Sequence, residues 1–165
     1  MQHVQTRSTT SALVLTAVLI ALATLFTMYT KIPVPGIRGY FNVGDVVIMT
    51  SALLLGRKSG AYIGAIGPAL ADLFLGYAVF VPITFVVKGI EGYLVGTVYN
   101  NKTTTSALVA TIVGGIVIVA GYFIAEYFVF DPGVAIASIL TNTIQAVMSV
   151  IISMILYAIL RKRLG

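Results

Sequence analysis

The chain has 165 residues, 59% of them hydrophobic, and its mean hydropathy is +1.04. This composition predicts a polytopic membrane protein of one domain, residues 1–165, and leaves no segment polar enough for a separate soluble domain. The net charge of +5 does not indicate nucleic-acid binding, because the basic residues lie in loops and termini between apolar segments. Cysteine is absent and His3 is the only histidine, so we expect no disulfide and no metal site.

Six apolar segments follow one another and predict an all-α membrane bundle of six transmembrane helices. Their approximate ranges are 11–29, 43–56, 60–77, 81–99, 104–128 and 134–160. A perpendicular crossing needs about 20 residues, so the second segment is too short unless part of the preceding loop adds to it. The first segment could be a signal peptide, but it is long enough to span and every later segment is equally apolar. We therefore expect a retained first helix.

The distribution of Lys and Arg predicts the orientation of these helices. Six spans place both termini on one side, and seven basic residues then share that side: Arg7, Arg57, Lys58, Lys102, Arg161, Lys162 and Arg163. The opposite side holds only Lys31 and Arg38, while Lys88 lies within a span. Because cytoplasmic loops are enriched in basic residues, both termini are predicted to be cytoplasmic.

The first outer loop, residues 30–42, is rich in Pro and Gly and ends with Tyr40 and Phe41. Pro fixes φ and Gly permits tight turns, so this composition favours a compact lid over the outer face. An ordinary connecting loop fits the same residues.

Polar residues of separate segments converge at similar depth in the outer half of the predicted bundle. Lys88 and Glu91 are three residues apart and share one helical face, about 10 and 15 Å from the outer surface. Asp72 lies about 8 Å below that surface. The candidate ligand-contacting residues are Tyr40, Asn42, Asp45, Asp72, Tyr77, Lys88, Glu91, Asn142 and Gln145.

Two interpretations of this convergence remain open. In one, the set is structural and Asp72 or Glu91 neutralises Lys88. In the other, it lines a pocket for a small heterocycle with hydroxyl or amino substituents, held by stacking and hydrogen bonds. Glu126 and Asp131 are predicted to be interfacial, with a weaker claim on a ligand. No nucleotide-binding motif and no pair of nucleophile and base is evident, so we expect no catalytic activity.

Small residues recur at the four-residue spacing that lets helices approach closely: Ala17 and Ala21, Gly60 and Gly64, and Gly92 and Gly96. Packing within the chain and docking to a separate membrane partner both fit this pattern.

Residues 39–96 contain the patterns F-N-x-G-D, G-x-x-x-G-x-x-G-x-A-x-A-D and K-G-x-E-G. This stretch resembles the substrate-binding S components of energy-coupling factor (ECF) vitamin transporters, in the branch with riboflavin-type and hydroxymethylpyrimidine or pyridoxine members. The resemblance implies a six-helix fold in a prokaryotic plasma membrane that captures a vitamin in its outer half, without a cofactor. It also implies docking to a transmembrane coupling subunit energised by two ATPase subunits, with Ala17 and Ala21 matching the docking face of helix one.

The predicted substrate is hydroxymethylpyrimidine or pyridoxine, with riboflavin as the alternative. Two other functions stay open at this point. A stand-alone proton-coupled carrier would use Asp72 or Glu91 as its protonation site, and a structural membrane protein would use the polar set only for helix packing.

Overall fold

The computed structural model describes residues 9–33, 40–99 and 103–164, and within these ranges the chain forms six helices and one pair of short strands. The elements are α1 (Thr9–Tyr29), β1 (Ile32–Pro33), β2 (Tyr40–Phe41), α2 (Gly44–Leu55), α3 (Arg57–Phe74), α4 (Phe80–Val98), α5 (Thr104–Val129) and α6 (Pro132–Leu164). The two strands pair antiparallel, with Ile32 opposite Phe41. The predicted all-α bundle is therefore confirmed.

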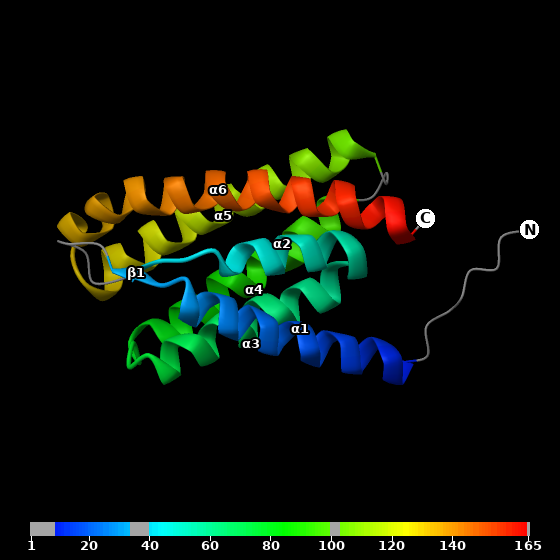
Figure 1. Cartoon of the computed structure of the whole chain (residues 1–165). Helices are drawn as coiled ribbons and strands as arrows, with labels where there is room; N and C mark the ends of the chain where they lie inside the picture. Colours follow the sequence, from blue (N-terminus) through cyan, green and yellow to red (C-terminus); the bar gives the residue numbers. More distant parts are fainter. Residues whose placement is uncertain (1–8, 34–39, 100–102, 165) are drawn as a thin grey trace, which may run out of the picture.

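The helices differ in their ability to cross a membrane. Within the described ranges, α1, α4, α5 and α6 are long and apolar enough to span. In contrast, α2 has 12 residues and a length of only about 18 Å. The chain reaches α2 through an extended stretch that runs along the bundle, so α2 starts deep inside it (Figure 1). The buried Asn42 lies on this stretch.

Two helix boundaries differ from the predicted ones for a local reason. Helix α3 begins at Arg57 rather than near residue 60, because Gly56 alone makes the turn from α2. Gly56 has φ of 85°, a left-handed conformation that side chains other than glycine rarely adopt. Helix α3 also ends earlier than predicted, at Phe74, shortly before a second glycine of positive φ, Gly76.

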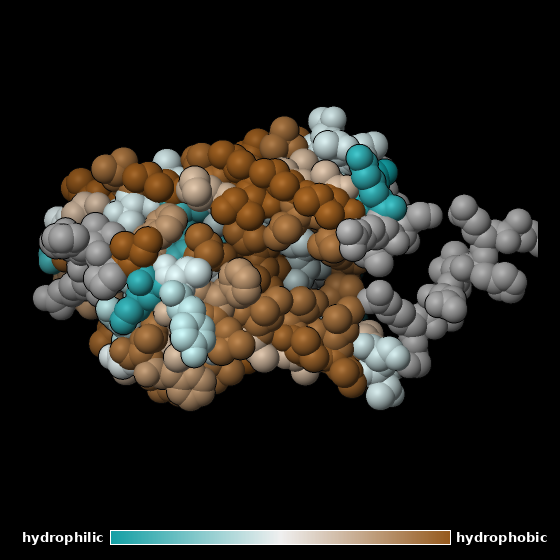
Figure 2. All heavy atoms as spheres, in the orientation of Figure 1, coloured by the Kyte–Doolittle hydropathy of each residue, from teal (hydrophilic) through white to brown (hydrophobic). Residues whose placement is uncertain are grey.

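The short helix α2 is the centre of the bundle. It contacts α1, α3, α4 and α6, and its residues 44–53 are all buried. On one side, α1 packs on α3 and α3 on α4, and on the other side α5 packs on α6 (Figure 1). The exterior around the middle of the bundle is mostly hydrophobic, and hydrophilic residues gather toward its two ends (Figure 2).

The two ends of the bundle are distinct. At the hairpin end lie β1 and β2, together with the turns that join α3 to α4 and α5 to α6 (Figure 1). At the terminal end, α1 begins and α6 ends.

The contact between α3 and α4 depends on glycine. A Cβ atom at Gly64 would collide with the carbonyl oxygen of Lys88, and one at Gly92 would collide with the carbonyl oxygen of Gly60. These backbones therefore approach more closely than any side chain would permit. The glycines of these two helices serve packing within the chain, whereas Ala17 and Ala21 lie exposed on α1.

Candidate binding site at the hairpin end

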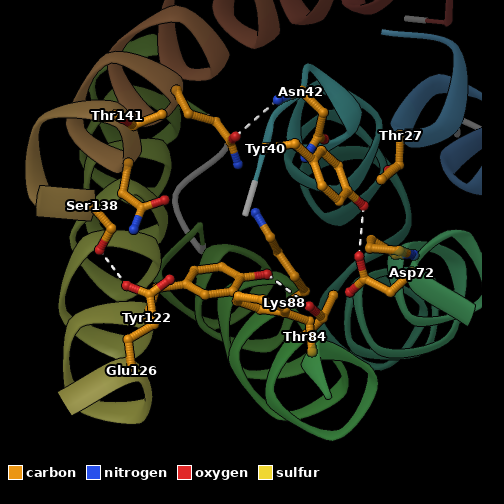
Figure 3. Close-up of a pocket in the computed structure, with 14 residues that line it drawn as sticks. Thr27, Tyr40, Asn42, Asp72, Thr84, Lys88, Tyr122, Glu126, Ser138 and Thr141 are labelled. Atoms are coloured by element: carbon orange, nitrogen blue, oxygen red, sulfur yellow. Dashed lines mark hydrogen bonds between the residues drawn. The ribbon is translucent and has the colours of Figure 1, made fainter. Parts of the chain in front are cut away.

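A cavity of about 40 Å³ opens within the hairpin end of the bundle. Polar and aromatic side chains from five helices and from the β2 segment surround it (Figure 3). The lining residues are Thr27, Tyr40, Asn42, Pro68, Asp72, Phe80, Thr84, Lys88, Tyr122, Glu126, Ser138, Thr141, Asn142 and Gln145.

Lys88 extends from α4 into the middle of this ring of residues (Figure 3). Its ammonium forms a short ion pair with Asp45 of α2 and lies 3.8 Å from the carboxylate of Glu91. The expected pairing of Lys88 with Glu91 is therefore present, but Asp45, which the sequence did not pair with Lys88, is the nearer partner. The reason is the depth of α2, because its first turn lies beside the middle of α4 and brings Asp45 to the lysine.

Gln145 of α6 completes the arrangement around Asp45. Its side-chain NH₂ donates to the second carboxylate oxygen of Asp45 at 2.7 Å, and its amide oxygen accepts from the backbone N–H of Asn42 at 3.0 Å. The side chain of Asn42 accepts from the backbone N–H of Gly44 at 2.8 Å and so holds the start of α2. Both oxygens of Asp45 are thus occupied, while neither oxygen of the fully buried Glu91 accepts a hydrogen bond.

A second carboxyl group, Asp72 of α3, lies in the cavity wall. The phenol of Tyr40 donates to its Oδ1 at 2.6 Å, while its Oδ2 accepts no hydrogen bond. Burial, reinforced by the neighbouring Asp72 carboxylate, raises the pKa of the Tyr40 phenol well above its usual range, so the phenol remains a donor. The Tyr77 ring packs against Tyr40 with ring centroids 4.9 Å apart, and Lys31 lies 5.3 Å above Tyr77.

A third carboxyl group, Glu126 of α5, also lines the cavity. Only 4% of the residue is exposed, and its carboxylate accepts a short hydrogen bond from Ser138 of α6. Glu126 therefore lies in the cavity wall, whereas Asp131 is exposed. The predicted position of both residues at the membrane interface stays a prediction. Helix α5 continues to Val129 and α6 covers its last turns, which buries Glu126. A carboxylate inside an apolar helix was the signal that pointed to it.

The predicted residues thus divide into two groups. Those that line the cavity are Tyr40, Asn42, Asp72, Lys88, Asn142 and Gln145. Asp45, Glu91 and Tyr77 lie behind this wall and contact residues that form it. Binding roles for all nine stay predictions.

Hydroxyl residues of the wall were missed by sequence reasoning. Tyr122 of α5 and Thr84 of α4 are joined through their hydroxyls at 3.0 Å, and the Tyr122 ring lies 5.5 Å from the Lys88 ammonium. Thr27, Ser138 and Thr141 complete the set. Ser, Thr and Tyr are common in membrane helices, so their positions carried no signal before the helices were placed together.

The arrangement suits binding rather than catalysis. It offers carboxylates, amides, hydroxyls and one ammonium around a small space with aromatic walls, which suits recognition of a polar ring. Among the residues that the structure describes, no group of three His, Cys, Asp or Glu side chains could hold a metal ion.

Comparison with known proteins assigns this architecture. Residues 7–162 match the model of the family described as ECF-type riboflavin transporter, S component. An uncharacterised protein from Pyrococcus woesei is 42% identical over 145 residues, covering 86% of this chain and 96% of that protein. The thiamine precursor transporter HmpT from Lactococcus lactis subsp. cremoris (strain MG1363) is 30% identical over 149 residues, covering 89% of this chain and 83% of HmpT.

The fold has a counterpart among solved structures. The solved structure of the S component of a bacterial ECF transporter superposes on this chain with a TM-score of 0.77 at 21% sequence identity. The match covers 94% of this chain and 98% of the other. The resemblance seen in residues 39–96 thus extends over nearly the whole chain. This protein belongs to the family of ECF-type riboflavin transporter S components, membrane proteins that bind small vitamin substrates, work with an ECF module and are not enzymes.

Proposed function

We propose that this S component captures a small single-ring vitamin precursor of the hydroxymethylpyrimidine type, with pyridoxine as the nearest chemical relative. The observation that carries the proposal is the cavity at the hairpin end, which is small and bordered by polar side chains on several sides. The description of the relative HmpT as a thiamine precursor transporter supports the same substrate class.

The size of the cavity favours a single ring. Its volume of about 40 Å³ corresponds to room for about three water molecules. A pyrimidine or pyridine ring needs only a modest further opening, whereas the three fused rings of riboflavin require a larger displacement of the wall. Riboflavin remains the alternative substrate, because the matching family is described as riboflavin-transporting.

The chemistry of the wall matches the same compounds. In the proposed complex, Lys88 and Asn142 donate hydrogen bonds to the substrate hydroxyl, and Asp72 accepts from a hydroxyl or amino group. The rings of Tyr122 and Phe80 supply apolar faces for stacking. Asp45 and Glu91 hold Lys88 in place without lining the cavity.

We propose that the hairpin end faces outward across a prokaryotic plasma membrane, with both termini in the cytoplasm. Five basic residues of the described chain support this orientation at the terminal end, namely Arg57, Lys58, Arg161, Lys162 and Arg163, against Lys31 at the hairpin end. In this arrangement α2 and α3 complete a six-helix transmembrane bundle. Because neighbouring helices bury α2, it does not need the full length of a lipid-exposed span.

We further propose that the chain docks to a transmembrane coupling subunit driven by two ATPase subunits. The exposed positions of Ala17 and Ala21 on α1 support a docking face there, since small residues permit close helix contact. Replacing both by Leu is expected to abolish uptake with the coupling subunits present and to leave substrate binding unchanged.

The direct test is binding by the purified chain. Isothermal titration with hydroxymethylpyrimidine, pyridoxine, riboflavin, thiamine and pantothenate identifies the substrate. The control variant is Asp131→Asn, a change at the exposed turn that should leave the affinity unchanged. Tight binding of hydroxymethylpyrimidine or pyridoxine supports the proposal. Binding of riboflavin alone contradicts it in favour of the alternative.

Uptake experiments separate transport by an S component from the other candidate functions. We expect uptake only when the coupling and ATPase subunits are co-expressed. Uptake by this chain alone that a protonophore abolishes would identify a proton-coupled carrier. Absence of binding and of uptake, in protein shown to be folded, would leave the structural function.

A further inference from the structure

We propose that the site selects a ring by its basicity, with Glu126 and a ring nitrogen of the substrate sharing one proton in the bound complex. This proposal rests on the proposed function, since it concerns a ligand in the same cavity. It assigns to Glu126 the role of a specificity-determining residue.

Buried acids outnumber buried bases around the cavity. Four buried carboxyl groups surround the cavity or support its wall, and each is at most 4% exposed: Asp45, Asp72, Glu91 and Glu126. In the described part of the chain, Lys88 is the buried cation that faces them. Four acids and one base cannot all be ionised without an excess of buried negative charge, which is costly in a low-dielectric surrounding.

Lys88 already pairs with acids other than Glu126. Its ammonium pairs with Asp45 and lies 3.8 Å from Glu91, so its charge compensates the two acids behind the wall. Asp72 and Glu126, which face the cavity, have hydroxyl donors instead of a cation. The two carboxyl groups without a cationic partner therefore face the cavity, where a ligand can bond to them.

Glu126 and Asp72 differ in the donors that the protein gives them. The Tyr40 phenol donates to Asp72 Oδ1 at 2.6 Å, while Asp72 Oδ2 is buried without a hydrogen bond. The Ser138 hydroxyl, in contrast, lies within hydrogen-bond distance of both Glu126 and the backbone carbonyl of Ala135, the latter at 2.9 Å. A hydroxyl has one proton and cannot donate fully to both acceptors. Both cavity carboxyl groups therefore keep acceptor capacity, and Glu126 is distinguished by its shared donor and by its place beside Tyr122 in the cavity wall.

The position of Glu126 also suits the edge of a ring. Tyr122 precedes it by one turn on the same face of α5, and Figure 3 shows the Tyr122 ring reaching from α5 toward Lys88, with Glu126 beside it. A ligand ring stacked on Tyr122 places one edge toward Glu126 and the opposite part toward Lys88. A ring nitrogen at the first edge meets a carboxyl group, and a hydroxyl at the other meets the ammonium.

The proton balance of binding follows from this arrangement. A neutral heterocycle enters, and one proton lies between its ring nitrogen and the Glu126 carboxyl, whether that proton came from the acid or from solvent. The pair is then a charge-assisted hydrogen bond of zero net charge. The charge of the site is unchanged if the proton came from the acid, and one negative charge is cancelled if the proton came from solvent. A more basic ring nitrogen strengthens this bond, while a ring with C–H at that position leaves the carboxyl without its partner.

The test compares ligands of the same outline and different basicity. Hydroxymethylpyrimidine and pyridoxine are titrated calorimetrically against their benzene analogues, in which C–H replaces the ring nitrogens, using the full chain at neutral pH. For the wild type we expect binding to weaken by about 10- to 100-fold on removal of the basic nitrogen, the range for a hydrogen bond to a charged group. In Glu126→Gln the side-chain NH₂ can still donate to a ring nitrogen but no proton is shared, so the preference should fall to about 2- to 10-fold, the range for a neutral hydrogen bond. Asp131→Asn, a change of an exposed acid at the same end, should retain the wild-type preference.

The outcomes separate the two proposals. Equal affinity for the heterocycles and their benzene analogues overturns the role of Glu126 and leaves the proposed substrate class intact. Absence of binding by all single-ring compounds overturns the proposed function and this role with it. If Glu126→Gln does not fold, Ser138→Ala decides, because removal of the hydroxyl donor should increase the preference for the basic ring. An unchanged or reduced preference in Ser138→Ala contradicts the proposal.

Discussion

The hairpin end and the terminal end both bury polar side chains, but of different kinds. At the terminal end the hydroxyls of Tyr99 and Tyr157 meet at 2.5 Å, and Thr16 donates to Ser59 at 3.2 Å. These groups are neutral and find partners within the protein. At the hairpin end the cavity wall contains carboxyl groups, and Asp72 keeps one buried oxygen without a hydrogen bond.

This difference separates polar groups that join helices from polar groups that await a ligand. A pair of hydroxyls completes its hydrogen bonds between two helices and needs nothing further. A buried carboxyl group without a full set of donors is costly and persists where function requires it. Buried carboxyl groups, rather than polarity or an unpartnered hydroxyl such as Thr50 or Ser149, therefore mark the candidate binding site at the hairpin end.

The substitution with the largest expected effect is Lys88→Met, which removes the buried cation of the hairpin end. The change leaves Asp45 and Glu91 buried without a cation, and breaking such an arrangement costs about 3–5 kcal/mol of folding free energy. Thermal unfolding in detergent measures the loss. The triple variant with Asp45→Asn and Glu91→Gln should recover most of the stability without recovering substrate binding. If Lys88→Met were as stable as the wild type, the lysine charge would not be required to stabilise Asp45 and Glu91 in the bundle.

A smaller effect is expected where α3 and α4 hold Lys88 in position. Gly64→Ala places a methyl group against the Lys88 carbonyl and should cost about 1–3 kcal/mol, because the backbones must separate. Gly115→Ala is the matched control, since the nearest atoms to its methyl group are side-chain atoms of Ala146 at 3.2 Å and Val150 at 3.7 Å. Unfolding curves of the two variants test the difference. Equal stability of the two would argue against a rigid α3–α4 contact.

Removal of the phenol in Tyr40→Phe tests the Asp72 side of the cavity. The variant takes away the hydrogen bond at 2.6 Å that holds Asp72, so substrate affinity is expected to fall by about 10-fold. The ring contact with Tyr77 remains, but the buried Asp72 loses its donor, so the folding free energy should fall by about 1–3 kcal/mol. Titration calorimetry gives the affinity. Unchanged affinity would remove Tyr40 and the Asp72 hydrogen bond from the binding site.

The smallest effect is expected at the terminal end, where a lost hydroxyl should affect stability and not substrate affinity. Tyr157→Phe removes one of two paired hydroxyls and should lower stability by about 0.5–1.5 kcal/mol. Because this pair lies far from the cavity, the substrate affinity of a variant that still folds should equal that of the wild type. A loss of affinity in Tyr157→Phe would show that the two ends are coupled.

Much of the membrane architecture was predictable from the sequence because it depends on local composition. Apolar segments of sufficient length predicted the helices, and charges inside such segments indicated where the site lies. The spacing of Lys88 and Glu91 placed both on one face of one helix, a relation set by the helical repeat alone. Motifs in residues 39–96 identified the family.

The tertiary structure decided which of these groups meet. Asp45 became the partner of Lys88 because an extended stretch carries the start of α2 into the middle of the bundle, a depth that segment lengths do not give. Glu126 became part of the cavity because α6 covers the last turns of α5 and brings Ser138 to it. Local sequence determines which face of its own helix a side chain occupies. The partner across the gap depends on how deeply and at what rotation two helices pack, and this is set by contacts between residues distant in the chain.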